Sequence, residues 1–318
     1  MSRTDDLLAL LGKSVSRDPQ GKNARLHFFG TVPFDDGTRV NTKDGSRFTT
    51  APCASDQPEP FDAPALLPTV VAVVSVNGGV GRSTLVTALS SGLQRLGGSV
   101  VALDLDPQNA LRQHFGVDHG LPGIGRTSLL NAQWGTVLQA GFAGCHVMPF
   151  GDIDIHQQEN LQRWLTRDPR WLAQRLSGLG LSERHTLIID TPAGNNVYQH
   201  QALNVADIVL VVVQPDAACL GTLDQMDTLL APYRERDCPP SCHVVMNQLD
   251  EHSAFSLDMA EAFKLRLGDD LLEVVHRDPL ISEALAFGTD PLDNVVKGLA
   301  SDDINELCQL LLSRKKSS

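Results

Sequence analysis

Hydrophobic residues beyond position 69 occur in short, nearly continuous runs that alternate with segments of helical periodicity. The runs cover residues 70–76, 100–105, 187–189, 208–213 and 244–246, and helical patterns follow the first two at 83–96 and near 109–115. Runs of this kind are typical of strands buried on both faces of a parallel sheet. The alternation predicts an α/β fold in which a mostly parallel, doubly wound sheet carries helices on both faces and ligands bind at the carboxyl ends of the strands.

The N-terminal part of the chain does not continue this pattern. A short helix is indicated at 4–11, where a threonine N-cap precedes four leucines and Gly12 ends the element. Five prolines and no basic residue then mark an extended linker. We therefore predict a poorly structured extension (1–47), a proline-rich linker (48–69) and one folded domain (70–318). Two interpretations of the extension stay open, a docking segment and a disordered tail.

Composition narrows the class of protein. The formal net charge of -12 over 318 residues disfavours binding to nucleic acid. Six scattered cysteines suggest neither a disulfide framework nor a zinc site. The chain contains no apolar stretch of roughly 20 residues, and its N-terminus is too short and too acidic for a secretory signal. These features predict a cytoplasmic protein.

A glycine-rich turn joins the first strand to the first helix. Glycines let backbone N–H groups converge on an oxyanion, and the start of the helix adds partial positive charge. The turn predicts a phosphate site, with Ser83 placed to ligate Mg²⁺, made of Gly78, Gly79, Val80, Gly81, Arg82, Ser83 and Thr84. Alone the match is weak, because the pattern G-x-x-x-x-G-K-[ST] meets Val76 at its first glycine and Arg82 at its lysine. A tight glycine turn without a ligand is the alternative.

Aspartates follow the next two strands. Asp104 and Asp106 lie at alternate positions at the end of the second strand, which allows both to face the nucleotide, and Asp190 ends the third strand. An aspartate at a strand end is more often a cap or a turn former than a metal ligand. Three of them in this order after a phosphate loop favour a Mg²⁺ site.

Together these segments resemble the deviant Walker A, switch I and switch II sequences of the ParA/MinD ATPases. The similar motifs are G-G-V-G with a basic residue and Ser-Thr, then D-x-D-P-Q and I-I-D-T-P, within roughly residues 70–299. The resemblance implies a P-loop NTPase that binds ATP and Mg²⁺ and forms an ATP-dependent homodimer. In that picture Asp190 holds Mg²⁺ through water, Asp106 orients the attacking water, and Asn247 binds the adenine.

The chain departs from this family at two lysines of the loop. Arg82 stands at the classical position, and its planar fork differs from a compact ammonium. Asn77 stands where a signature lysine of the family reaches the partner's phosphates, and it has no charge. Since such a cation stabilises transition-state charge, these replacements predict slow ATP hydrolysis or none.

Residues 148–164 and 276–283 also resemble the branch of the family that belongs to bacterial cellulose-secretion operons. That resemblance implies a nucleotide-dependent regulator or scaffold of cellulose synthesis and secretion. Its partners would be other cellulose-operon proteins at the cytoplasmic face of the inner membrane, which would recruit it there or to the cell pole. The alternative is a cycling ATPase that positions DNA or protein cargo.

The C-terminal segment 301–313 places four apolar residues on one helical face, and three basic residues follow it. Membrane anchoring and packing against the sheet both explain this pattern. Basic residues complement the dipole at the end of a packed helix. We predict the packed helix and no direct membrane anchor.

Overall fold

The computed structural model describes residues 67–293 and 298–315. The helix expected at 4–11, the extension (1–47) and most of the proline-rich linker lie outside the described residues. Within the two described ranges, no helix has both the length and the apolar composition that crossing a membrane requires.

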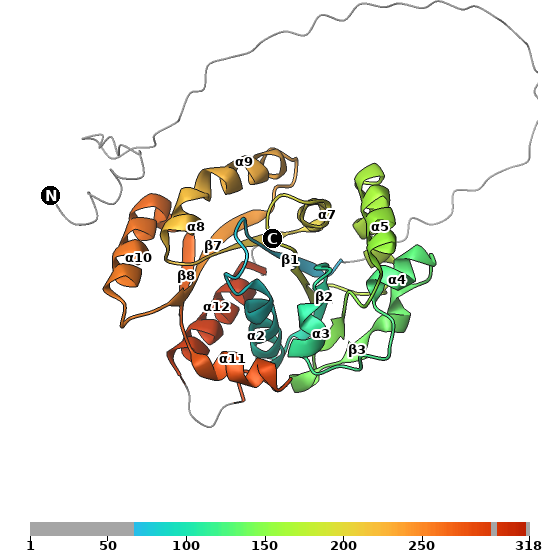
Figure 1. The fold of residues 1–318 in the computed structure, drawn as a ribbon, viewed down its shortest axis with the longest axis horizontal. Helices are drawn as coiled ribbons and strands as arrows, with labels where there is room; N and C mark the ends of the chain where they lie inside the picture. The colour runs from blue at the N-terminus through green and yellow to red at the C-terminus, as the bar shows by residue number, and fades with distance from the viewer. Residues whose placement is uncertain (1–66, 294–297, 316–318) are drawn as a thin grey trace, which may run out of the picture. The chain divides into compact units, whose positions relative to one another are not determined.

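The described strands form one sheet with the order β3-β4-β2-β5-β1-β6-β7-β8 (Figure 1). Neighbouring strands are parallel except β3, which runs antiparallel to β4. The strands are β1 (Thr69–Val74), β2 (Ser99–Asp104), β3 (Gln139–Ala140), β4 (His146–Met148), β5 (His185–Asp190), β6 (Ile208–Val213), β7 (Ser241–Leu249) and β8 (Leu271–His276). The predicted doubly wound α/β fold is confirmed.

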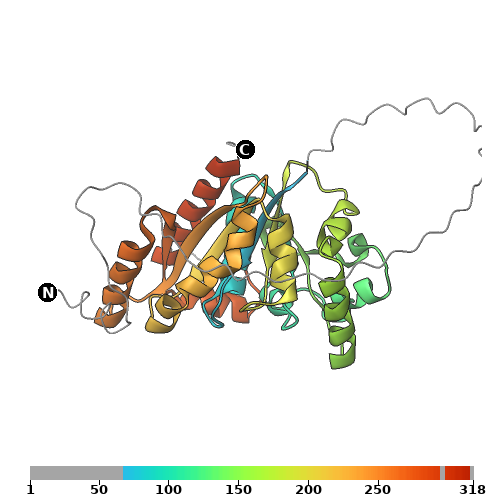
Figure 2. The same cartoon turned by 90° about the horizontal axis from the view of Figure 1, so that it is seen from above.

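Helices cover both faces of this sheet (Figures 1 and 2). One face carries α2 (Arg82–Arg95), α3 (Ala110–His114), α11 (Pro279–Ala286) and α12 (Leu299–Lys315). The other carries α7 (Val197–Val205), α9 (Leu223–Arg234) and α10 (Ala254–Leu267). The remaining elements are α4 (Ile124–Leu129), α5 (Ile155–Arg167), α6 (Trp171–Ser177), α8 (Ala217–Gly221) and the 3-10 turns η1 (Trp134–Val137), η2 (Phe142–Gly144) and η3 (Gly268–Asp270).

The central strands are built from branched apolar residues that are buried on both faces. All six residues of β6 are buried, as are the last five of β1. The C-terminal helix α12 contacts α2 and β8 and buries Ile304, Leu307 and Leu311. Its apolar face therefore belongs to the core, which is the arrangement predicted for a packed last helix. Because the central strands are parallel, the loops after β1, β2, β5 and β7 meet at one edge of the sheet.

Candidate nucleotide-binding site

The glycine loop lies between β1 and α2, at the edge where the strands end. Gly81 caps α2 with a left-handed backbone (φ 85°), and its carbonyl accepts the N–H of Leu85 at 2.9 Å. A Cβ atom at this position would collide with the side-chain amide of Asn247. Both the conformation and the close approach therefore require glycine.

Side-chain amides from two other strands hold the loop in place. Asn247 is buried in β7 and donates from Nδ2 to the Val80 carbonyl at 2.9 Å. Gln214, which follows β6, and Gln248 each donate from Nε2 to the Gly79 carbonyl at 3.3 Å. Asn247 was predicted to lie at this site, whereas the two glutamines were not. Their position at the carboxyl ends of strands was the signal that could have identified them.

Arg82, at the classical lysine position, is bound within its own loop. Its Nη1 donates to the Ser75 hydroxyl and, at 3.2 Å, to the Asn77 carbonyl. Its Nη2 lies 4.0 Å from Oδ2 of Asp106. Burial lowers the pKa of Arg82, and the charges of Asp190 and Asp106 oppose this shift. The guanidinium therefore faces the carboxylates of the site while it is tied to the loop backbone.

Asn77, at the signature-lysine position, is also bound within the chain. Its Oδ1 accepts a hydrogen bond of 2.6 Å from the hydroxyl of Thr222, which lies between α8 and α9. The Ser75 hydroxyl donates to the Asn77 carbonyl at 2.6 Å. The residues at both lysine positions therefore form hydrogen bonds within one protomer.

Asp190 ends β5 in full burial, and neither of its carboxylate oxygens has a hydrogen-bond partner among the described residues. Burial raises the pKa of Asp190 to about 7, opposed by the Ser83 hydroxyl and the Arg82 guanidinium. The Ser83 hydroxyl is near enough to favour the charged form of Asp190 but makes no hydrogen bond of normal geometry to it, so the buried carboxylate is costly unless another group satisfies it. The hydration shell of Mg²⁺ would supply the missing donors, and Ser83 offers an oxygen ligand at the start of α2. The residues present therefore fit this ion.

Asp104, the last residue of β2, and Asp106, which follows the strand, have different roles. Asp104 is fully buried and accepts the backbone N–H groups of Asp106 at 2.9 Å and Leu111 at 3.0 Å. Burial, followed by the charge of Asp190, raises the pKa of Asp104 well above its usual range. The sequence spacing allowed Asp104 to face the nucleotide. In the structure both of its oxygens accept backbone N–H groups instead, so Asp104 shapes the loop. Asp106 accepts the N–H of Gln108 at 2.9 Å with one oxygen and turns the other toward Arg82.

A cavity of about 290 Å³ lies beside the loop, between the start of α2 and the loop that follows β8. Thr84, Asn247 and residues 276–278 are among those that line it. The ring of His276 is held from both sides, by Asp303 at 2.8 Å and Glu251 at 3.2 Å. The cavity thus brings Asn247 together with residues 276–278, which belong to a segment that resembles the cellulose-operon branch.

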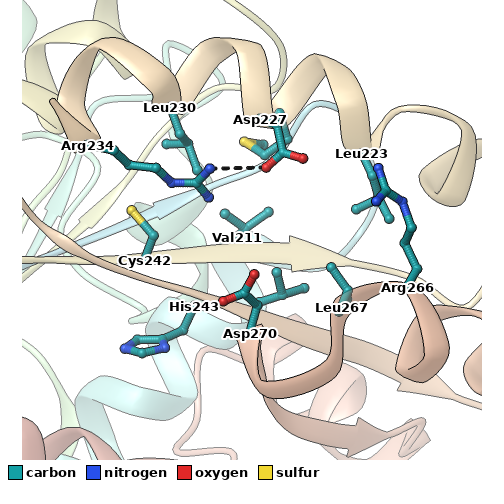
Figure 3. Close-up of a pocket in the computed structure, with 12 residues that line it drawn as sticks. Val211, Leu223, Asp227, Leu230, Arg234, Cys242, His243, Arg266, Leu267 and Asp270 are labelled. Carbon is teal, nitrogen blue, oxygen red and sulfur yellow. Dashed lines mark hydrogen bonds and ion pairs between the residues drawn. The ribbon is translucent and has the colours of Figure 1, made fainter. Parts of the chain in front are cut away.

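Another cavity, between α9, β7 and the end of α10, is only about 100 Å³ in volume (Figure 3). Its guanidinium groups already have acidic partners, since Arg234 lies 3.2 Å from Asp227 and Arg266 lies 2.7 Å from Asp224. Cys242 and His243 contribute from the first half of β7, away from the carboxyl ends of the strands. Its small volume and the internal pairing of its charged groups argue against a second nucleotide site here.

A glycine loop after the first strand, with carboxylates after two neighbouring strands, defines a P-loop protein of the ParA/MinD class. Comparison with solved structures agrees, since MinD from Pyrococcus horikoshii OT3, complexed with Mg-ADP, has a TM-score of 0.64 and 21% identity over 78% of this chain and 99% of that chain. The family model of cellulose biosynthesis protein BcsQ matches residues 68–312, and the chain belongs to this family.

Two curated relatives illustrate the similarity, one from the BcsQ family and one from the ParA proteins. BcsQ of Escherichia coli (strain K12) is 31% identical over 245 residues, covering 76% of this chain and 94% of the relative. The chromosome partitioning protein ParA of Caulobacter vibrioides is 26% identical over 257 residues, covering 78% and 95%. Membership of the BcsQ family places the protein in cellulose biosynthesis, on a fold that it shares with ParA.

Proposed function

We propose that this protein binds ATP with Mg²⁺, forms a homodimer in the ATP-bound state, and acts as a nucleotide-controlled scaffold for cellulose synthesis and secretion. Slow or absent hydrolysis is supported by the hydrogen bonds of the two residues that replace the loop lysines. Asn77 is bonded to Thr222, and Arg82 to Ser75 and the loop backbone. Neither presents a free ammonium group to stabilise charge on a transferring phosphoryl group.

The proposed roles follow the geometry of the site. The loop from Gly78 to Thr84 would bind the phosphates, with the Ser83 hydroxyl and, through water, Asp190 holding Mg²⁺. The ion would neutralise charge on the β- and γ-phosphates. Asp106 would orient water if hydrolysis occurs, and Asn247 would bind the base in the adjoining cavity. The Mg-ADP complex of the related MinD fold supports the choice of cofactors.

The proposed partners are other proteins of the cellulose machinery at the cytoplasmic face of the inner membrane, which would recruit the protein there or to the cell pole. Family membership supports the pathway. The net charge of -12 argues against nucleic acid as a partner. Burial of the apolar face of α12 argues against direct anchoring by that helix.

The test combines light scattering with phosphate release on the same samples, using ATP–Mg²⁺, ADP–Mg²⁺ and no nucleotide. We expect a dimer with ATP only, and little phosphate release. Asp190→Asn serves as the variant that should abolish the nucleotide effect. A protein that stays monomeric with every nucleotide would refute the proposal.

The alternative function is a cycling ATPase that positions DNA or protein cargo, which the 26% identity to ParA favours. It predicts rapid phosphate release, repeated assembly and disassembly of the dimer, and binding to DNA or another cargo. Rapid turnover in the same experiment would select this function over the scaffold.

A further inference from the structure

A third cavity, of about 510 Å³, lies between α3, α4 and the loop that follows β4, apart from the glycine loop and from the 290 Å³ cavity beside that loop. Its basic groups are Arg112, His119 and Arg126, and its one carboxylate is that of Asp152. This composition contrasts with the net charge of -12 of the whole chain. The local excess of hydrogen-bond donors needs an explanation.

Arg112 is the anchor of this cavity. It is only 3% exposed, although a guanidinium group is expensive to bury. Its Nη1 reaches Oδ2 of Asp152 at 2.7 Å, but the side chain of Asp152 is 86% exposed. Its Nε is buried and has no hydrogen-bond partner in the described part of the chain. One solvent-screened carboxylate therefore leaves part of a five-donor group unsatisfied.

The polar groups near Arg112 are bonded elsewhere and do not supply the acceptor that its Nε lacks. The Thr127 hydroxyl donates to the Gly123 carbonyl at 2.8 Å, and the carboxylate of Asp118 accepts the N–H of Gly120 at 2.7 Å. The first N–H groups of α4 are bonded to the loop that follows β4, with Ile124 donating to the Pro149 carbonyl at 2.9 Å. The positive character of the cavity therefore comes from side chains and not from a helix end.

Exposed apolar groups shape the rest of the cavity. Leu121 and Leu130 line it and are 47% and 71% exposed. Its volume lies in the range of roughly 300–1,000 Å³ that is usual for small-molecule sites. Apolar walls with two guanidinium groups suit a compact molecule that carries a phosphate, because the planar fork of arginine matches phosphate oxygens.

We propose that this cavity is a second anion site, which binds the phosphate group of a small molecule through Arg112 and Arg126. Arg112 lies in α3, directly after the loop of Asp106, so the occupied site would adjoin the nucleotide site without sharing its residues. The proposal does not depend on ATP binding at the glycine loop.

The experiment is isothermal titration of inorganic pyrophosphate into the full chain at low ionic strength. Arg126→Gln removes an exposed arginine and should weaken binding at least tenfold without affecting the fold. Arg112→Lys keeps the charge but loses the fork, and should also weaken binding. Arg163→Gln, which removes an exposed arginine of α5 outside the cavity, is the matched control and should bind normally.

A glycine-loop variant, Gly81→Ala, separates this site from the nucleotide site and should retain a pyrophosphate-binding event that depends on Arg126. No binding by the wild type, or binding that is unchanged by Arg126→Gln, would overturn the proposal. Co-sedimentation with phosphatidylcholine vesicles containing phosphatidic acid distinguishes the phosphate source. Association that requires Arg126 would assign it to a lipid headgroup, and no association would assign it to a soluble molecule.

Discussion

Gly81 offers a sharp test of the site, because it is constrained both by its backbone and by its surroundings. An alanine at φ 85° costs about 1–2 kcal/mol for the left-handed conformation. Its Cβ would also displace the side chain of Asn247, which then loses its bond to Val80, at a further cost of about 1 kcal/mol. We expect Gly81→Ala to lower the free energy of unfolding by about 2–3 kcal/mol, or the midpoint by roughly 4–12 °C.

The control is Gly97→Ala, because Gly97 has φ 89° but nothing lies within 4 Å of an added Cβ. It should show the backbone cost alone, and normal nucleotide binding. Thermal unfolding by circular dichroism measures the stabilities, and titration of a fluorescent ATP analogue measures affinity. Because Asn247 lines the cavity proposed to hold the base, its displacement should weaken nucleotide binding to Gly81→Ala at least fivefold, or by about 1 kcal/mol. Equal destabilisation by the two variants, or full affinity in Gly81→Ala, would refute the reasoning.

Three further predictions test other parts of the structure. Because the pKa of Asp190 is raised to about 7 in the folded state, the contribution of this carboxyl group to stability is complete below its unfolded pKa near 4 and is lost as the pH rises to 7. Without nucleotide, Asp190→Asn should therefore be more stable than the wild type at pH 8, as measured by urea unfolding. Near pH 4 the variant should lose that advantage. The double variant Asn77→Lys with Arg82→Lys places an ammonium group at both lysine positions, and we expect phosphate release to be at least tenfold faster. An unchanged rate would show that another residue limits hydrolysis. Leu307→Ala removes a fully buried side chain of α12 and should cost about 2–5 kcal/mol in chemical denaturation, whereas Leu265→Ala, 70% exposed, should cost less than about 0.5 kcal/mol.

Most of the sheet could be predicted because burial on both faces gives its central strands a clear pattern in the sequence. A strand buried on both faces needs apolar residues at every position, as in 208–213, and such a run is visible in the sequence. The strands that were missed lack this property. Strand β4 has three residues, and β8 is mostly half-buried, so neither produces a continuous apolar run.

The site could be predicted as far as it depends on strand order along the chain. The positions of Asp190 and Asn247 follow from parallel strands that end at one edge. The bond between Asn77 and Thr222 could not be predicted, because it joins residues 145 positions apart and Thr222 has no distinctive neighbours. The backbone role of Asp104 also depends on how the chain turns after β2, which its spacing from Asp106 does not reveal.

The hydrogen bonds that Arg82 and Asn77 make within the protein reduce the free energy that is available for ligand binding. A nucleotide that recruits Arg82 must first replace the bonds to Ser75 and to the loop backbone. Each bond given up subtracts about 1 kcal/mol from the binding free energy, which is roughly a fivefold loss of affinity. For the ATP binding proposed above, this cost raises the ATP concentration that is needed to fill the site. The proposed ATP-dependent dimer would then form only at a high ATP concentration, and the proposed scaffold for a costly polymer would disassemble when ATP runs short.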